Sequence, residues 1–289
     1  MERCAKISNR IKTFYNPQMS CPSGGYSPSG EKPDAVLADW SQRNWVEIED
    51  FAPATDEDLA LAHCTDYIQC IFDGMTANGH GNCDPDVAES TRWTVGSFMA
   101  AARIAVQDRA ITCSPSSGFH HAGYDNNHGF CTFNGLIVAA RSVLDGPHVN
   151  RVAILDYDWH AGDGTREIID RLGLSDEVLH YSSGFQWPGS AQQYFSWLRD
   201  SLGQIVEKGI DLILYQAGAD AHKDDPLGGL LDNDELAERD RMVFELYRHH
   251  QIPIAWNLAG GYQRDEDGTI EKVVAIHRTT MDIARNGNH

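Results

Sequence analysis

Short apolar runs rich in β-branched residues recur along the chain from residue 110 onward. Each run spans only a few residues and lacks the polar alternation of a half-exposed strand, which is typical of strands buried on both faces of a parallel sheet. We therefore predict strands at residues 110–113, 152–156, 178–180, 211–216 and 252–258.

Between these runs, apolar positions recur at the spacing of an α-helix. The pattern predicts helices at residues 56–75, 134–144, 191–208, 233–250 and 269–285. The first of them begins with Asp56, Glu57 and Asp58, acids that suit the positive amino end of a helix. The alternation of strands and helices predicts an α/β fold, with a mostly parallel sheet covered by helices on both faces.

The domain organisation follows from what the chain lacks. It has no internal repeat and no low-complexity linker, so residues 1–289 are predicted to form a single domain. A hydrophobic content of 42% is enough to fill a sizeable core. The segment CPSGGYSPSGEKP at 21–33 is rich in Pro, Gly and Ser, which indicates a surface loop.

The charge of the chain limits the classes of molecule that it is expected to bind. There are 42 Asp and Glu against 23 Lys and Arg, for a formal net charge of -19. Such a surface repels nucleic acid and favours cationic substrates. The sequence leaves open whether the chain forms a homo-oligomer.

Compartment signals are those of a cytoplasmic protein. The amino terminus MERCAKISNRIKTFY lacks the apolar stretch of a signal peptide, and no apolar run approaches the roughly 20 residues that span a bilayer. The seven cysteines are an odd number without a C-x-x-C pair, which indicates reduced thiols rather than disulfides or a zinc ribbon. We expect a cytoplasmic location and no membrane association.

Polar residues follow four of the predicted strands at their carboxyl ends. Ligands of open α/β sheets gather at this edge, so we expect these residues to converge on one site. They are His120 and His121 after 110–113, Asp156, Asp158 and His160 at the end of 152–156, Asp220 after 211–216, and Tyr262 after 252–258.

Asp158, His160 and Asp220 have the chemistry of a metal site. Asp158 and His160 form an Asp-x-His pair that an extended segment can present to one ion, and Asp220 can complete the set. Two oxygens and one nitrogen leave coordination positions open, as in catalytic sites where zinc lowers the pKa of a bound water to about 7. The D-x-D-x-H motif alone fits a helix cap or a solvated charge equally well.

The tandem histidines His120 and His121 differ from other histidines of the chain because they follow a loop at a strand end. To act as base or acid, each needs a carboxylate that orients its far ring nitrogen. Asp156 and Asp163 are available for that purpose. In Gly260-Gly261-Tyr262, the glycines permit tight backbone geometry and the Tyr262 hydroxyl can donate to a developing oxyanion, although Tyr262 alone would fit a packing aromatic.

Taken together, these motifs resemble the histone deacetylase family, in the group that includes acetylpolyamine amidohydrolases and bacterial deacetylase-like amidohydrolases. The resemblance covers about residues 115 to 262, and more weakly SPSGEKP (27–33) and GNCDPDV (81–87). The matching segments, in the family's order, are SSGFHHAG (116–123), HGFCTFNG (128–135), ILDYDWHAGDGT (154–165), FQWPGS (185–190), QAGADAHKDDPLGG (216–229) and LAGGY (258–262).

This resemblance implies the arginase/deacetylase fold, one catalytic Zn²⁺, and hydrolysis of the N-acetyl amide of a lysine or polyamine. The substrate would be a small-molecule or peptide acyl-amine, cationic in character. Residue by residue, it implies that Asp158, His160 and Asp220 bind zinc, that His121 is the general base and acid beside His120, that Asp156 and Asp163 orient the two histidines, and that Tyr262 polarises the acetyl carbonyl.

The resemblance also implies substrate contacts and a second cation. Phe130 and Trp187 match the apolar walls of the acyl-lysine tunnel, and Asp84 matches a rim acid that holds the substrate backbone. Structural monovalent-cation sites of the family lie near the Asp156 segment, which makes K⁺ a candidate there.

Three substitutions and one shortening depart from the family. Gly118-Phe119 stands where Pro-Gly usually precedes the tandem histidines, Ala161 replaces a frequent second histidine, and Ala259 replaces a glycine. WPGS runs almost directly into the helical pattern AQQYFSWLRDSL, without the usual longer loop and strand. We therefore predict a more open or differently covered mouth, which leaves the substrate class open.

Two other functions compete. An arginase-type ureohydrolase would bind two metals, and its ligands would be Asp158, His160, Asp163, Asp220, His222 and Asp224. That interpretation leaves the tandem histidines and Tyr262 unexplained. A silent module that binds acyl-lysine without cleaving it is the second alternative, and the intact set of candidate catalytic residues argues against it.

Overall fold

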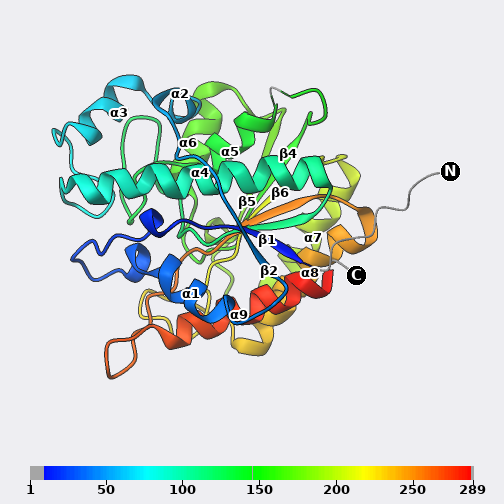
Figure 1. Ribbon diagram of the computed structural model, residues 1–289. Coiled ribbons are helices and arrows are strands. Elements are labelled where there is room, and N and C mark those ends of the chain that lie inside the picture. The colour runs from blue at the N-terminus through cyan, green and yellow to red at the C-terminus, as the bar shows by residue number, and fades with distance from the viewer. Residues whose placement is uncertain (1–9, 145, 288–289) are drawn as a thin grey trace.

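The computed structural model describes residues 10–144 and 146–287 (Figure 1). Within them, a seven-stranded sheet has the order β2-β1-β3-β7-β6-β4-β5. Every strand pair is parallel. The strands are β1 (Ile11–Phe14), β2 (Val46–Glu49), β3 (Ile111–Ser114), β4 (Val152–Asp156), β5 (Val178–Ser182), β6 (Leu212–Gln216) and β7 (Ile254–Asn257). The predicted α/β fold with a parallel sheet is confirmed.

Helices cover both faces of the sheet (Figure 1). Their bounds are α1 (Lys32–Trp40), α2 (Asp56–Leu59), α3 (Thr65–Phe72), α4 (Pro85–Asp108), α5 (Gly135–Leu144), α6 (Asp163–Leu172), α7 (Ala191–Glu207), α8 (Asn233–His250) and α9 (Glu271–Gly287). Helices α2 to α6 pack into one apolar cluster, and α1, α7, α8 and α9 pack into another.

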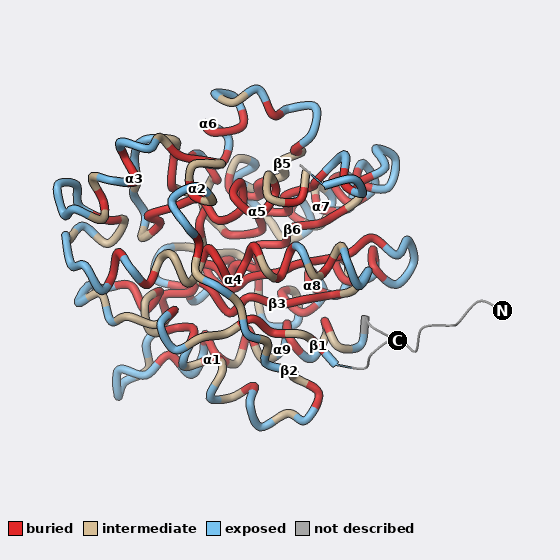
Figure 2. The backbone as a smooth tube through the Cα atoms, turned by 45° about the horizontal axis from the view of Figure 1, so that its top comes forward, coloured by how far each residue is buried: buried red, intermediate tan, exposed pale blue. Residues whose placement is uncertain are grey.

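Side-chain alternation in the central strands divides these two clusters. In β4, Val152 and Ile154 belong to the cluster of α4 and α5, whereas Ala153 and Leu155 belong to the cluster of α7 and α8. All four are 0% exposed, so both faces are buried, as the unbroken apolar run predicts. Figure 2 shows the buried residues concentrated in the sheet and on the inner sides of the helices.

The helix predicted at 56–75 is wrong in extent, because the structure contains two short helices, α2 and α3, over this segment. The break between them carries His63 into the core. His63 Nδ1 lies 2.9 Å from the Gly123 carbonyl oxygen, and its Nε2 accepts a hydrogen bond from Asn134 N at 2.8 Å. A buried polar ring needs both partners, and a continuous helix would not present His63 to them.

The surface loop predicted at 21–33 is also wrong in its second half. Ser27, Pro28 and Ser29 are buried, and Lys32 begins α1 with no exposed surface. The Lys32 ammonium donates to the Gly260 carbonyl oxygen and to Ser117 Oγ at 3.2 Å. This segment therefore closes onto the edge of the sheet where β7 ends.

Two remaining expectations concern cysteines and membranes. Cys21, Cys64, Cys70, Cys83, Cys113 and Cys131 are free thiols, as predicted, and Cys4 lies outside the described residues. Within the part of the chain that the structure describes, no helix combines the length and apolar character that crossing a bilayer requires.

Candidate active site

The carboxyl ends of β4 and β6 place Asp158, His160 and Asp220 in one cluster. His160 Nδ1 lies 3.2 Å from Asp158 Oδ1 and 2.8 Å from Asp220 Oδ2. One ligand atom from each residue lies within 4.8 Å of the other two. Asp158 is 2% exposed and Asp220 is 0% exposed, so two carboxylates are buried side by side.

The electrostatics of this cluster call for a cation. Burial and the neighbouring Asp158 carboxylate raise the pKa of Asp220 to about 7. Burial opposes the ionisation of Asp158 too, but the His120 and His160 rings lower its pKa below the usual range. Hydrogen bonds to Asp158 and Asp220 raise the pKa of His160 to about 11. Two oxygens and one nitrogen around a buried excess of negative charge fit a divalent metal ion.

Glycines let the backbone approach these ligands. A Cβ at Gly260 would lie 2.1 Å from Asp220 Oδ1, and a Cβ at Gly218 would lie 2.4 Å from the Asp158 Cα. Trp159 N donates to Asp220 Oδ1 at 3.2 Å, which fixes that carboxylate. The position of Asp220 therefore depends on the absence of a side chain at Gly260, and the position of Asp158 on its absence at Gly218.

His120 lies deep in the site, between two acids. Its Nδ1 is 2.9 Å from Asp156 Oδ2, and its Nε2 is 3.6 Å from Asp158 Oδ1. Burial alone would lower the pKa of His120, but the Asp156 and Asp158 carboxylates raise it to about 9. Sequence reasoning missed Gln216, whose Nε2 donates to Asp156 Oδ1 at 2.7 Å and whose Oε1 accepts from Phe119 N at 3.1 Å. Its place as the last residue of β6 was the signal that could have identified it.

His121 has the opposite electrostatic character. Its Nδ1 is 2.6 Å from Asp163 Oδ1, and its ring centroid is 4.1 Å from that of His120. Burial and the positive neighbour His120 lower the pKa of His121 to about 4. Gly129 lies against the ring, since a Cβ there would be 2.3 Å from His121 Cδ2. At neutral pH the tandem pair therefore holds one protonated and one neutral imidazole.

Tyr262 follows β7 and faces the acids. Burial and the Asp158 and Asp220 charges raise the pKa of its hydroxyl well above the usual value, so it stays an O–H donor. Tyr262 N donates to Asp225 Oδ2 at 2.7 Å, and the Tyr262 ring lies 5.7 Å from the Phe130 ring.

Lys32 is a second residue that sequence reasoning missed, because its partner Gly260 lies far along the chain. Burial lowers the pKa of the Lys32 ammonium to about 8, although Asp220 and Asp158 oppose this effect. Its bond to the Gly260 carbonyl supports the tight turn that leads into Tyr262. Ala259, just before this turn, has a φ of 146°, a backbone conformation that favours glycine.

The predicted substrate contacts lie at different depths. Phe130 is half-buried with a φ of 64°. Trp187 is 67% exposed, and its ring meets that of Trp159 edge to face at 6.5 Å. Asp84 is the N-cap of α4, and its Oδ1 accepts from Asp86 N at 2.9 Å. The substrate roles of Phe130, Trp187 and Asp84 stay predictions.

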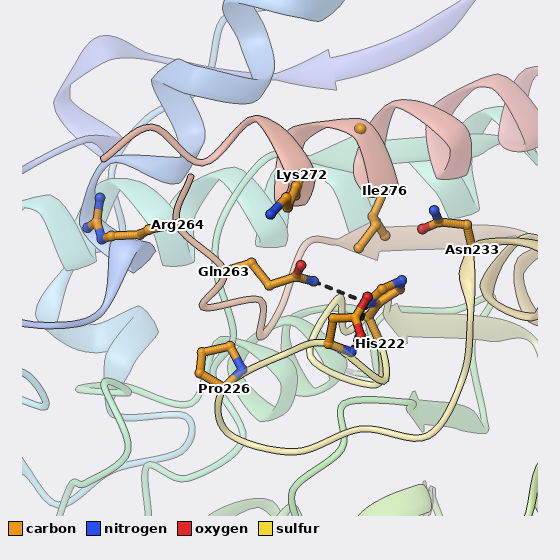
Figure 3. Close-up of a pocket in the computed structure, with 9 residues that line it drawn as sticks. His222, Pro226, Asn233, Gln263, Arg264, Lys272 and Ile276 are labelled. Atoms are coloured by element: carbon orange, nitrogen blue, oxygen red, sulfur yellow. Dashed lines mark hydrogen bonds and ion pairs between the residues drawn. The ribbon is translucent and has the colours of Figure 1, made fainter. Parts of the chain in front are cut away.

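The arginase-type interpretation needs His222 and Asp224 as metal ligands, and the structure directs His222 elsewhere. His222 Nδ1 accepts from Asp224 N at 3.1 Å and lies 3.3 Å from Gln263 Nε2. His222, Gln263 and Lys272 line a cavity of about 550 Å³. Figure 3 shows His222 beside Gln263 among the residues that line it. Neither His222 nor Asp224 joins a metal-binding group of the described residues, so the geometry does not support this ligand assignment.

Comparison with known proteins agrees with the geometry. The histone deacetylase domain matches residues 34–194 and 189–277 of the chain. A probable deacetylase of Methanothermobacter thermautotrophicus is 26% identical over 263 residues, covering 77% of this chain and 78% of that protein. Acetylpolyamine amidohydrolase 2 of Pseudomonas aeruginosa is 27% identical over 184 residues, covering 54% of this chain and 52% of that protein, about half of each. The crystal structure of the HDA15 HD domain has the same fold, with a TM-score of 0.78 at 18% identity, covering 95% of this chain and 90% of that one.

Proposed function

The chain belongs to the histone deacetylase family and is an amidohydrolase of that family, and on this premise we propose that it is a zinc-dependent deacetylase of N-acetylated lysine side chains or polyamines. The observation that carries the proposal is the buried Asp158, His160 and Asp220 cluster, which faces the tandem histidines and Tyr262. This arrangement supplies a metal site, a base and an oxyanion donor around one point.

Asp158, His160 and Asp220 would hold the zinc ion. A zinc ion held there supplies a Lewis acid that lowers the pKa of a water molecule and polarises a carbonyl group. The neighbouring Asp156 segment is where we propose K⁺.

His121 accepts the proton of the attacking water at Nε2. It is suited to this role because Asp163 holds its Nδ1 and because its lowered pKa keeps the ring neutral at physiological pH. His120 carries a proton in the same range, and Asp156 fixes its orientation. One of these two histidines then protonates the leaving amine.

Tyr262 donates its hydroxyl hydrogen to the acetyl oxygen as negative charge develops there. Its raised pKa keeps that hydrogen in place, and the bond from Lys32 to Gly260 holds the turn before it. A silent binding module would not need this set of base, acid and oxyanion donor.

The proposed substrate is a cationic acyl-amine. The net charge of -19 attracts amines, and the exposed Trp187 beside Trp159 presents aromatic faces on which an ammonium group can rest. The chain is similar to an acetylpolyamine amidohydrolase, which supports polyamines beside acetyl-lysine. The single-domain organisation over 1–289, the cytoplasmic location and the absence of nucleic-acid and membrane partners belong to the same proposal.

The test is turnover by metal-replete protein. Protein loaded with one equivalent of zinc is incubated with an acetyl-lysine peptide and with acetylated polyamines, and free amine is measured. We expect hydrolysis that a chelator abolishes and added zinc restores. If no acyl-amine is cleaved, the chain is a binding module and the proposal is wrong.

A further inference from the structure

His128 has no role in the proposed mechanism, although it lies beside the general base. Its Nε2 is 3.0 Å from Asp163 Oδ2, while His121 Nδ1 is 2.6 Å from the other oxygen of the same carboxylate. The two imidazole rings are 4.6 Å apart between centroids. One carboxylate therefore joins two imidazoles that come from different loops.

The spacing of these three residues is that of metal ligands. One ligand atom from each of His121, His128 and Asp163 lies within 4.8 Å of the others, as in the buried cluster. Two ring nitrogens and a carboxylate oxygen are a donor set that suits zinc and similar divalent ions. The group thus differs from an acidic surface cluster, because two of its three donors are imidazoles.

The loop that carries His128 is held in place. Cys131 N donates to the His128 carbonyl oxygen at 3.0 Å, and Phe130 N donates to the Gly79 carbonyl oxygen at 3.0 Å. Gly129 packs on the His121 ring, where a larger residue would collide. These contacts set the distance between the two rings before any ion arrives.

Solvent reaches this group, in contrast to the buried cluster. The side chains of His128 and Asp163 are 50% and 51% exposed, and that of His121 is 16% exposed. An ion can enter directly from solvent, and water can complete its coordination. Exposure also weakens binding, because solvated ligands lose more hydration when they bind an ion.

We propose that His121, His128 and Asp163 form a second divalent-metal site, weaker than the catalytic cluster, whose occupation inhibits the enzyme. Metal binding at this second site is independent of the proposed function, whereas the inhibition rests on the proposed function.

Inhibition follows from the tautomer of His121. In the metal-free group, the neutral ring carries its hydrogen on Nδ1 and donates it to Asp163, which leaves the Nε2 lone pair free to accept a proton. An ion bound at Nδ1 needs the lone pair on that nitrogen, so the hydrogen moves to Nε2. The base nitrogen is then already protonated, and the positive ion opposes a second proton on the ring.

Zinc binding and activity are measured in parallel on metal-free protein, by equilibrium dialysis with elemental analysis and by turnover. The wild-type protein is expected to bind two ions per chain. Activity should rise to the first equivalent and fall about tenfold or more as the second ion binds, because the base is removed.

His128→Ser should bind one ion and escape this inhibition, since the second site falls from three protein ligands to two and its Kd rises at least about tenfold. The short serine side chain could disturb the loop, so His128→Gln serves as a second variant. Gln can still donate to Asp163 but is a poor zinc ligand, and His128→Gln should therefore also bind one ion and escape the inhibition. His249→Ser removes an exposed histidine at the end of α8 and should keep both ions.

One ion per wild-type chain would overturn the proposal. So would two ions and unchanged inhibition in both His128 variants, because His128 would then be only a hydrogen-bond partner of Asp163. If the protein cleaves no acyl-amine, the ion count still decides whether the second site exists.

Discussion

The floor and the rim of the site are built in different ways. The floor, formed by His120, Asp156, Asp158, His160 and Asp220, is buried except for part of His160, and its polar atoms are bound by groups from neighbouring strand ends. The predicted rim, Asp84, Phe130 and Trp187, lies on loops or at a helix start, and Trp187 is largely exposed. We therefore expect the sheet to fix the reaction and the loops to determine which substrate reaches it.

The largest effect should come from the floor. Asp220→Ala leaves the catalytic cluster with two ligands, so the protein should lose zinc, and activity should fall to background. Zinc per chain is measured by elemental analysis. Asp224→Ala is the matched control, because this acid of the same loop is 71% exposed and lies outside the cluster. Stoichiometric zinc in Asp220→Ala would contradict the ligand assignment.

Tyr262→Phe should keep zinc and lose about 10²- to 10³-fold in kcat, the effect of removing one oxyanion donor. The Tyr26 ring stacks on that of Tyr262 at 6.5 Å, so Tyr26→Phe keeps this contact and serves as the control. Steady-state kinetics of both variants separate the two hydroxyls. Activity of Tyr262→Phe close to that of the wild-type protein would mean that Tyr262 only packs.

Zinc affinity should rise with pH in two steps. The pKa of His160 is raised to about 11 and that of Asp220 to about 7, and both groups must be deprotonated to bind the ion. Between pH 7 and 9, zinc binding displaces one proton, from His160, so the Kd should fall about tenfold for each unit that the pH rises. Below pH 7, Asp220 is protonated too, so zinc binding displaces two protons and the Kd should change by up to about a hundredfold per pH unit. Competition with a chelating indicator measures this dependence, and a Kd that is constant from pH 6 to 9 would contradict it.

The smallest effect should come from the rim. Trp187→Ala should raise KM for a cationic acyl-amine about two- to fivefold, as expected for the loss of an exposed cation–π contact of about 0.5–1 kcal/mol, and leave kcat unchanged. A neutral acyl-amide substrate is the control and should show no such change. Equal effects on both substrates would mean that Trp187 shapes the mouth without contacting the charge.

The floor could be predicted from sequence because its residues come in short motifs directly after strands. Parallel strands end at one edge, so Asp158, Asp220 and Tyr262 had to meet there once the strands were identified. Gln216 is itself the last residue of β6 and could have been found in this way, whereas Lys32 could not, because its partner Gly260 lies 228 residues away along the chain. Such pairs are set by tertiary packing, which leaves no local pattern.

Strands β1 and β2 and helix α4 were not revealed by the apolar pattern. The strands β1 (IKTF) and β2 (VEIE) are short and contain charged residues, so neither shows a continuous apolar run. Helix α4 has polar residues such as Ser90, Thr91 and Arg92 among its apolar positions, which dilutes the helical periodicity. β1 and α4 owe their stability to tertiary packing, and β2 to its pairing with β1, more than to their own sequence.

The contact between Lys32 and Gly260 ties the beginning of the fold to its end. During synthesis, the Tyr262 turn leaves the ribosome long after α1 has emerged. The hydrogen bond from Lys32 to Gly260 can therefore form only after most of the chain has been made. Contacts of such long range also slow folding, because the intervening chain must be ordered first. Catalytic competence should therefore appear as the last event in folding, and partly made chains should carry no premature hydrolytic activity.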